Sequence, residues 1–445
     1  MSHSLPKLLL PQRYSKKTLY LIAVLVSLLL TATTLYIINR DKSRTNTVSE
    51  QLSTIDKSIA TTESKLSADP NNINLLVTLC QNYLQKVRET ADTEYYSKCD
   101  VLLARASAID PSSDQIIAAE SALAYGRHNF IGGLELAKKA VALNSNKVSY
   151  YGLLGDGQLE LGQYTEAISS FQTMVDGRPD LSSYNRVAYL RELYGDIEGA
   201  KSALRSAISA GSSYPENVAF SQVELGKLYA RTDLNEAEQM FNQALYTYKD
   251  FPPALEGLGK VAFARNDYNK ALKHFQQAFD DLPIAQYSSA LGDTYSAMGD
   301  VAKAGQQYYL AQLAFDQSTA SGVNNDYELS AYLSTRGKDT AKALDLAKKS
   351  LSVRPNIFSY DAVAWALYNS GNYPDAQAQI NEALKTGLRV PIVYFHAGMI
   401  ADKMGQTQQA IEYIETAFEL DNYLLESHFS LLDRNTATVT LERIK

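Results

Sequence analysis

The sequence predicts an all-α protein, a right-handed α-solenoid of about ten helical hairpins preceded by one transmembrane helix. The first observation behind this prediction is a period of 34 residues, which separates Pro111, Ser145 and Pro179 and is typical of stacked helical hairpins. The second is an uncharged run from residue 19 to residue 38, long enough to cross a bilayer core of about 30 Å as a helix. Because each hairpin buries its apolar face against its neighbours, a solenoid presents a long surface for binding.

The most regular repeat unit spans residues 148–181. Its marked positions are Leu154 and Gly155 early, Tyr164 at the turn, Ala167 and Phe171 in the second helix, and Pro179 at the end. Small residues let two antiparallel helices approach closely, and proline cannot continue the second helix. The register returns in residues 258–283 and 291–311 and, more weakly, in other segments, so about ten repeats fit between residues 71 and 421.

These positions resemble the tetratricopeptide repeat, and the resemblance covers residues 71–425. It implies that the first helix of every repeat lines a concave groove, which binds a protein or peptide partner. Family members that hold chaperone C-termini use a clamp of Lys and Asn, but the central repeats here lack the paired Asn. Residues 361–368 and 394–400 resemble a repeat pair found near the ends of bacterial members of the superfamily.

The pattern along the chain predicts seven segments. They are a cytoplasmic N-terminal tail (1–18), a transmembrane helix (19–38), a helical stalk (39–70), an N-terminal repeat stack (71–316), a hinge (317–325), a C-terminal repeat stack (326–425), and a capping helix with a loose tail (426–445). In the stalk, Val48, Leu52, Ile55 and Ile59 form one helical stripe, which either pairs with a second copy or lies on the first repeat.

Topology follows from the charges around the apolar run. Lys7, Arg13, Lys16 and Lys17 precede it, and this excess favours a cytoplasmic N-terminus. We therefore expect a single-pass membrane protein whose solenoid is extracytoplasmic, in a periplasm or at a cell surface. A solenoid that faces the cytosol is the alternative.

Two cysteines fall in the first predicted hairpin. In repeat register, Cys99 takes the position of Ala167 and Cys80 that of Gly155, and these are positions that touch. A disulfide would close a loop of about 20 residues and stabilise the terminal repeat by roughly 3 kcal/mol. The alternative is that both thiols serve as small apolar side chains at crowded positions.

One row of residues should lie on the inner wall of the groove, namely Asp156, Tyr189, Lys227, Lys260, Asp293, Tyr332, Trp365 and Met399. Lys227, Lys260 and Arg231 would form a basic centre for a carboxylate or an acidic segment. In the alternative interpretation, these residues belong to an ordinary solvated inner face, and Glu256 neutralises their positive charge.

Further along the chain, aromatic residues gather in the C-terminal repeats. We expect a wall made of Tyr332, Phe358, Trp365, Tyr368 and Phe395. Such a wall can anchor a peptide or stack on a polysaccharide, and its alternative role is packing between repeats. Asp361 and His396 lie one repeat apart, so we expect a hydrogen bond that locks neighbouring repeats.

Composition argues against other functions. The net charge of −7 combines 42 basic and 49 acidic residues without a basic patch, which disfavours nucleic-acid binding. The five histidines show no ligand spacing, so we expect no metal or cofactor, and no nucleophile or phosphate motif predicts an enzyme. We expect a membrane-tethered scaffold in envelope assembly, secretion or surface-polymer export, or alternatively a polysaccharide-binding export component.

Overall fold

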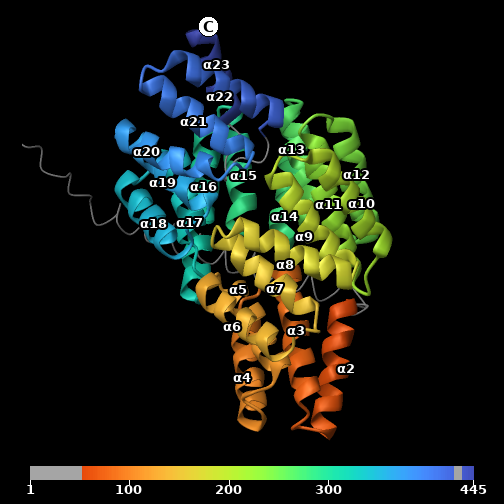
Figure 1. Cartoon of the computed structure of the whole chain (residues 1–445). Coiled ribbons are helices and arrows are strands. Elements are labelled where there is room, and N and C mark those ends of the chain that lie inside the picture. Colours follow the sequence, from red (N-terminus) through yellow and green to blue (C-terminus); the bar gives the residue numbers. More distant parts are fainter. Residues whose placement is uncertain (1–52, 425–432) are drawn as a thin grey trace, which may run out of the picture. The chain divides into compact units, whose positions relative to one another are not determined.

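The computed structural model describes residues 53–424 and 433–445 of the chain. The predicted cytoplasmic tail and transmembrane helix lie outside these residues. In the described part, 22 helices occur without a strand, and none of these helices has the length and apolar character needed to span a bilayer. Residues Thr54–Lys445 form one compact unit, drawn in Figure 1.

Ten helical hairpins follow one another in this unit, which confirms the predicted repeat number. Each pairs an odd-numbered first helix with an even-numbered second helix: α3 (Ile73–Thr90) and α4 (Glu94–Ile109), α5 (Asp114–Gly126) and α6 (Phe130–Leu143), α7 (Ser149–Glu160) and α8 (Tyr164–Gly177), α9 (Leu181–Leu193) and α10 (Ile197–Ala210), α11 (Pro215–Ala230) and α12 (Leu234–Thr247), α13 (Pro252–Ala264) and α14 (Tyr268–Asp281), α15 (Ala285–Ala297) and α16 (Val301–Ala320), α17 (Asp326–Thr335) and α18 (Thr340–Val353), α19 (Ile357–Asn369) and α20 (Tyr373–Lys385), α21 (Pro391–Lys403) and α22 (Thr407–Leu420).

Small residues allow the two helices of a hairpin to approach closely, as the sequence predicts. A Cβ atom placed on Gly155 would lie 2.3 Å from Cε1 of Phe171, and one on Gly259 would lie 2.4 Å from Cε1 of Phe275. Both phenylalanines are buried. Because any side chain at these glycines would displace a core aromatic ring, the glycines set the spacing inside the hairpin.

The stalk helix lies on the first repeat. Helix α2 (Thr54–Ala68) packs against α3, with Ile59 partly buried against the cluster that contains Leu66, and Ile55 of the same helix is also buried. Lys86 of α3 forms an ion pair with Asp56 at 2.7 Å. The stripe predicted from Ile55 and Ile59 is therefore used within the chain, while its first members, Val48 and Leu52, lie outside the described residues.

The predicted loose tail is wrong for residues 433–444, which form α23 (Asp433–Ile444). This helix contacts α21 and α22, and Ala437 is fully buried. Ion pairs join Arg443 to Asp402 at 2.5 Å and Lys445 to Glu415 at 2.7 Å. The tail is helical because it covers the last apolar face, a role that the sequence assigned to the beginning of segment 426–445, whose residues 426–432 all lie outside the described part.

The solenoid returns to itself after six repeats (Figure 1). Turns inside the second, fourth and fifth hairpins accept hydrogen bonds from the segments that precede the eighth and tenth hairpins and from the segment that follows the tenth. The backbone N–H groups of Asn324, Arg389 and Asn422 donate to the carbonyl groups of Arg127 (3.2 Å), Leu193 (2.7 Å) and Arg231 (2.9 Å), respectively. The Asn356 side chain donates in the same way to the Glu160 carbonyl at 3.0 Å. A second superhelical turn therefore rests on the edge of the first.

The predicted hinge is part of this contact. Residues 317–320 continue α16, and Val323 is buried in a cluster with residues of α3, α4 and α5. Next to it, Nδ1 of His128 lies 2.8 Å from the carbonyl oxygen of Asn324. Residues 317–325 therefore join the two predicted stacks, because their backbone forms hydrogen bonds with residues of the N-terminal stack.

Candidate functional site

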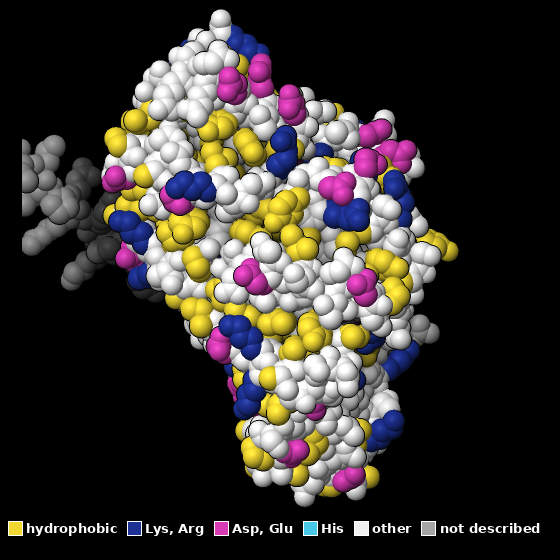
Figure 2. Space-filling view, in the orientation of Figure 1, with side chains coloured by type: hydrophobic (Ala, Val, Ile, Leu, Met, Phe, Trp, Pro, Cys, Tyr) yellow, Lys and Arg dark blue, Asp and Glu magenta, His cyan; other side chains and the backbone are white. Residues whose placement is uncertain are grey.

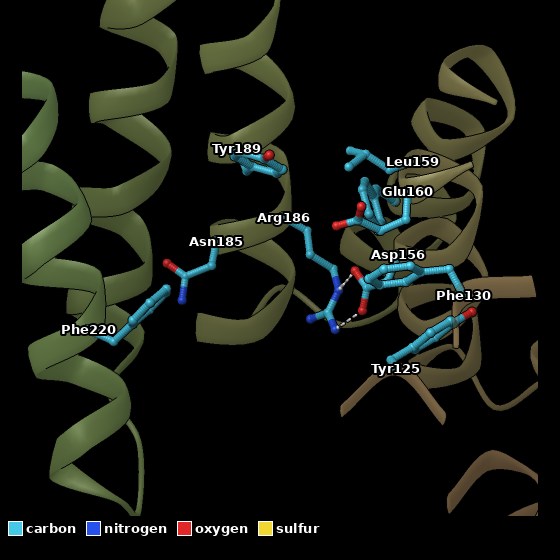
Figure 3. A pocket seen from close by; sticks show the side chains of 10 residues that line it. Tyr125, Phe130, Asp156, Leu159, Glu160, Asn185, Arg186, Tyr189 and Phe220 are labelled. Atoms are coloured by element: carbon cyan, nitrogen blue, oxygen red, sulfur yellow. Dashed lines mark hydrogen bonds and ion pairs between the residues drawn. The ribbon is translucent and has the colours of Figure 1, made fainter. Parts of the chain in front are cut away.

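A cleft of about 340 Å³ opens on the concave face of the N-terminal stack. The first helices α5, α7, α9 and α11 contribute most of its walls, and Phe130 at the start of α6 adds to them. Figure 3 shows Phe220 of α11 on one side and Tyr125 and Phe130 on the other, with the side chains of α9 between them. The cleft therefore crosses four consecutive repeats.

One ion pair spans the middle of the cleft. Arg186 of α9 reaches Asp156 of α7 with two parallel contacts, Nε to Oδ1 at 2.8 Å and Nη2 to Oδ2 at 2.6 Å (Figure 3). Burial opposes the charge of Arg186, but the Asp156 carboxylate outweighs it and raises the pKa of the guanidinium. The pair is fixed in geometry and close to neutral in sum, which suits a cleft that binds a partner mainly through apolar contact.

Aromatic side chains supply that apolar contact. Tyr189 is 40% exposed and Phe220 is 42% exposed, and both line the cleft. Tyr125 is held by a hydrogen bond from its hydroxyl to the carbonyl of Leu153 at 2.9 Å. Two accessible rings beside an anchored third one provide a surface for an apolar or aromatic side chain of a partner.

The edge of the cleft meets the returning turn of the solenoid. Glu160, which lines the cleft, accepts from Nε of Arg354 at 2.7 Å, and Nη2 of Arg354 lies 2.5 Å from the same oxygen. The Arg354 guanidinium also stacks 4.6 Å from the ring centre of Phe130. Burial raises the pKa of Glu160, with Arg354 acting in the opposite direction. The two turns thus meet through a largely desolvated ion pair.

The predicted basic centre does not present open charge. Lys260 pairs with Glu256 at 3.0 Å, which confirms the alternative of a neutralised inner face. Lys227 pairs with Glu224 at 3.0 Å, and the buried Arg231 pairs with Glu192. Of the predicted row, Tyr189 alone combines high exposure with a place in the cleft.

The expectation of an exposed aromatic wall is wrong for three of its members. Tyr332, Trp365 and Phe395 are only 4%, 7% and 0% exposed, while Phe358 and Tyr368 are half-buried. They belong to one core cluster with residues of the N-terminal stack, including Leu159, Leu190 and Leu193. The wall is sealed by neighbouring repeats, since Tyr332 lies against Phe315 and Trp365 lies against Phe395 and His396, which bears out the alternative of packing between repeats.

Within the sealed wall, the predicted lock between neighbouring repeats is confirmed. Nδ1 of His396 lies 2.9 Å from Oδ1 of Asp361, and both residues are buried. Trp365 stacks on His396 with 3.9 Å between ring centres and on Tyr368 with 4.7 Å. Hydrogen bonding and stacking together fix α19 against α21.

The two cysteines touch, as their register predicts, and both are free thiols in this structure. Sγ of Cys99 donates to the carbonyl of Cys80 at 3.2 Å, and neither side chain is exposed. The hydrogen bond with Cys99, together with burial, raises the pKa of the Cys80 thiol. The structure thus places them as small core residues, and the disulfide is not formed in it.

The polar residues of the described segments show no metal-binding group, since no cluster of three His, Cys, Asp or Glu side chains occurs there. Figure 2 shows basic and acidic side chains interspersed over the face that it draws, with apolar side chains between them. An anionic polymer would meet no continuous basic track on this face.

The fold and the cleft define an α-solenoid of helical hairpins with a concave site. Family models for the tetratricopeptide repeat match residues 256–319 and 392–423. The chain therefore carries tetratricopeptide repeats, a scaffold fold that typically mediates protein–protein interaction. Comparison with curated protein sequences finds no match.

Solved structures with similar folds include several repeat proteins. A tetratricopeptide repeat protein from Parabacteroides merdae is 15% identical, with 64% of this chain and 98% of that chain covered and a TM-score of 0.35. PilW, a type IV pilus biogenesis factor, is 14% identical over 46% of this chain and 94% of that chain, with a TM-score of 0.39. The human IFIT1 dimer is 15% identical over 74% and 77%, with a TM-score of 0.46.

Proposed function

We propose that the protein is a non-enzymatic, membrane-tethered scaffold that binds a peptide segment of a protein partner in the cleft over α5, α7, α9 and α11. The observation that carries this proposal is the pair of accessible rings, Tyr189 and Phe220, in a concave site that a neighbouring repeat does not fill. Elsewhere on the concave face, equivalent aromatic residues are buried.

The cleft offers two kinds of contact to such a segment. An apolar side chain of the partner would insert between Tyr189 and Phe220, where burial of its surface contributes most of the affinity. Figure 3 shows Asn185 extending from α9 toward Phe220 and Arg186 extending from the same helix toward Asp156, and both would orient the partner's backbone. Since Arg186 is already paired with Asp156, strongly charged segments gain little here.

Residues 19–38 would provide the tether, with the solenoid outside the cytoplasm. The uncharged run and the basic residues before it support this part of the proposal. Its test is a pair of reporters fused after Lys445, one active only outside the cytoplasm and one only inside. Activity of the cytoplasmic reporter alone would instead support the cytosol-facing adaptor.

Recognition of a polysaccharide is less well supported. The aromatic wall on which it depended contains Tyr332, Trp365 and Phe395, which are buried. A glycan would have to use the same cleft as a peptide, where only Tyr189 and Phe220 are exposed rings. Envelope assembly, secretion and surface-polymer export all remain processes in which a scaffold of this kind can act.

Site-specific photo-crosslinking in native membranes tests the cleft. We would replace Phe220 by p-benzoylphenylalanine and, as the matched control, Tyr246, which is 93% exposed on α12 outside the cleft. We expect a protein adduct at position 220, lost when Tyr189→Asp is added, and none at position 246. Equal labelling at both positions, or labelling unaffected by Tyr189→Asp, would contradict a specific cleft.

A further inference from the structure

The first hairpin differs from later ones at the place where its two helices approach most closely. In seven later hairpins this place pairs two residues that are glycine or alanine: Gly155 and Ala167, Ala188 and Ala200, Gly259 and Ala271, Gly292 and Ala304, Ala331 and Ala343, Ala364 and Ala376, Gly398 and Ala410. The approach leaves little room, since a Cβ placed on Gly398 would lie 3.2 Å from the carbonyl oxygen of Ala410. In the first hairpin the same places hold Cys80 of α3 and Cys99 of α4.

The two thiols contact each other in this crowded place. Neither side chain is exposed, and Sγ of Cys99 lies 3.2 Å from the backbone carbonyl oxygen of Cys80. Because glycine and alanine fill the same place in other hairpins, packing alone does not require two sulfur atoms here. A disulfide requires two cysteines whose backbones lie close together and whose side chains point toward each other, and this contact between antiparallel helices meets the requirement.

We propose that Cys80 and Cys99 are a covalent modification site, at which a disulfide forms when the chain folds in an oxidising compartment. The two thiols lose two protons and two electrons as the S–S bond forms. A disulfide of an oxidoreductase or of oxidised glutathione accepts them and becomes two thiols. The proposal rests on the proposed placement of the solenoid outside the cytoplasm, where such oxidants act.

Burial determines when this bond can form. In the closed hairpin no oxidant reaches either sulfur, because both side chains are fully buried. The contact with Cys99, together with burial, also raises the pKa of the Cys80 thiol, so the folded hairpin contains little of the reactive thiolate. The bond therefore forms before α4 closes on α3, and the closed hairpin then protects it from reductants. It acts as a permanent brace rather than a reversible switch.

The brace lies where the stalk joins the repeats. Helix α3 holds the stalk through the ion pair of Lys86 with Asp56 at 2.7 Å and through the hydrogen bond from the Tyr83 hydroxyl to Glu63 at 2.8 Å. Since this hairpin is the terminal repeat, it has another repeat on one side only, and terminal repeats unfold most easily. Closing a loop of about 20 residues limits that unfolding. The disulfide would thus secure the repeat to which the tether is attached.

Counting thiols in full-length protein from native membranes tests the bond. The membranes are dissolved in denaturant with a maleimide reagent that adds a large polymer to each free thiol. We expect no label before reduction and two labels after it. Cys80→Ala and Cys99→Ala each leave one thiol, which should react without reduction and so controls for access of the reagent. Two labels on the unreduced wild type, together with an active extracytoplasmic reporter after Lys445, would overturn the proposal.

Refolding in glutathione separates the pairing from the proposed topology. Full-length protein that has been denatured and reduced is refolded with oxidised and reduced glutathione and digested with trypsin. A fragment that joins the peptides of Cys80 and Cys99 is expected wherever the solenoid lies in the cell. Two free thiols after refolding would overturn the pairing. A joined fragment, combined with free thiols in membranes and an active cytoplasmic reporter, would contradict the topology and with it formation of the bond in the cell.

Amide hydrogen exchange tests the brace itself. In the oxidised protein, peptides from α3 and α4 should exchange about a hundredfold more slowly than in the reduced protein, because the loop can no longer open freely. Peptides from α19 and α20, in a hairpin without cysteine, provide the control and should exchange equally in both forms. Equal exchange of α3 and α4 in the two forms would show that the bond does not stabilise the terminal repeat.

Discussion

Two parts of the concave face have the same repeat positions and opposite exposure. In the N-terminal stack, Tyr189 of α9 is 40% exposed and lines a cleft, while in the C-terminal stack Tyr332 of α17 and Trp365 of α19 are 4% and 7% exposed. The repeat register is the same in both. The difference shows that the side chains supplied by adjacent repeats, and not the position within the repeat, decide which aromatic residues are available for binding.

Packing between neighbouring repeats explains this difference. Trp365 of α19 is covered by Tyr368 of the same helix and by Phe395 and His396 of α21, and Tyr332 of α17 lies against Phe315 of α16. At Phe220 no such cover exists, and its ring remains 42% exposed. The buried rings of the C-terminal stack therefore contribute to stability, whereas the exposed rings of the N-terminal stack remain accessible to a partner.

The largest expected effect comes from truncating the sealed ring. Trp365→Ala should lower the free energy of unfolding by about 3–5 kcal/mol, because it removes a buried ring that stacks on Tyr368 and His396. Phe220→Ala, the matched change in the open stack, should cost less than about 1 kcal/mol. Denaturant unfolding of the full-length protein, followed by circular dichroism, measures both. Similar losses for the two variants would remove the distinction between a sealed and an open face.

The next effect tests the ion pair that joins the two turns. Arg354→Gln should destabilise the fold by about 3 kcal/mol, because it leaves Glu160 without its guanidinium in a desolvated place. Adding Glu160→Gln should recover part of this loss, since no uncompensated charge then remains.

Trp365 is the only tryptophan, so its fluorescence reports directly on the sealed face. In Arg354→Gln, acrylamide should quench Trp365 more strongly if the two turns separate. The exposed pair of Lys138 and Glu135 provides the control, and Lys138→Gln should change neither stability nor quenching measurably. Unchanged quenching in Arg354→Gln would show that the ion pair does not hold the turns together.

Much of the fold could be predicted because it depends on local and repeated features. The period gives the ten hairpins, and small residues at positions such as Gly155 and Gly259 give their close approach. Register also brought Asp361 to His396 and Cys80 to Cys99, because residues one repeat apart, or on the two helices of one hairpin, meet in a fixed way.

The return of the solenoid could not be predicted from the same features. Its contacts join backbone groups of turns, such as Asn324 to Arg127, which leave no residue-specific mark in the sequence. The side-chain contact of Asn356 with Glu160 spans 196 residues and breaks no repeat rule. Exposure of the aromatic residues depends on side-chain packing between neighbouring repeats, so the sequence identified the wall correctly as aromatic and wrongly as open. The sequence missed the cleft ring Phe220 because it lies seven residues before Lys227, the row position on α11.

A smaller effect is expected inside a single hairpin of the open stack. Gly155→Ala should destabilise by roughly 1–3 kcal/mol, because its Cβ would come within 2.3 Å of the Phe171 ring. Phe171→Leu in the same chain frees space and should make the Gly155→Ala change less costly than it is in the wild type. Additive losses in thermal unfolding of the two single variants and the double variant would show that the two positions do not meet.

The smallest expected effect is a change in folding stability with pH, caused by one buried carboxyl group of the N-terminal stack. Glu216 at the start of α11 is buried and accepts a hydrogen bond from Nε2 of Gln85 at 2.8 Å. Burial raises the pKa of this carboxyl, while the hydrogen bond from Gln85 and the charge of Arg88 act in the opposite direction.

An acid with a raised pKa binds more protons in the folded state than in the unfolded state, so its contribution to stability is complete at low pH. This contribution is lost as the pH rises through the folded-state pKa of Glu216. Glu216→Gln keeps an acceptor for Gln85 and removes the charge, so the variant should gain stability relative to the wild type between pH 4 and pH 7. Melting temperatures of both proteins across this range measure the effect. If the wild type instead gains on the variant as the pH rises, the ion pairing with Arg88 outweighs desolvation, and α3 would hold α11 through charge.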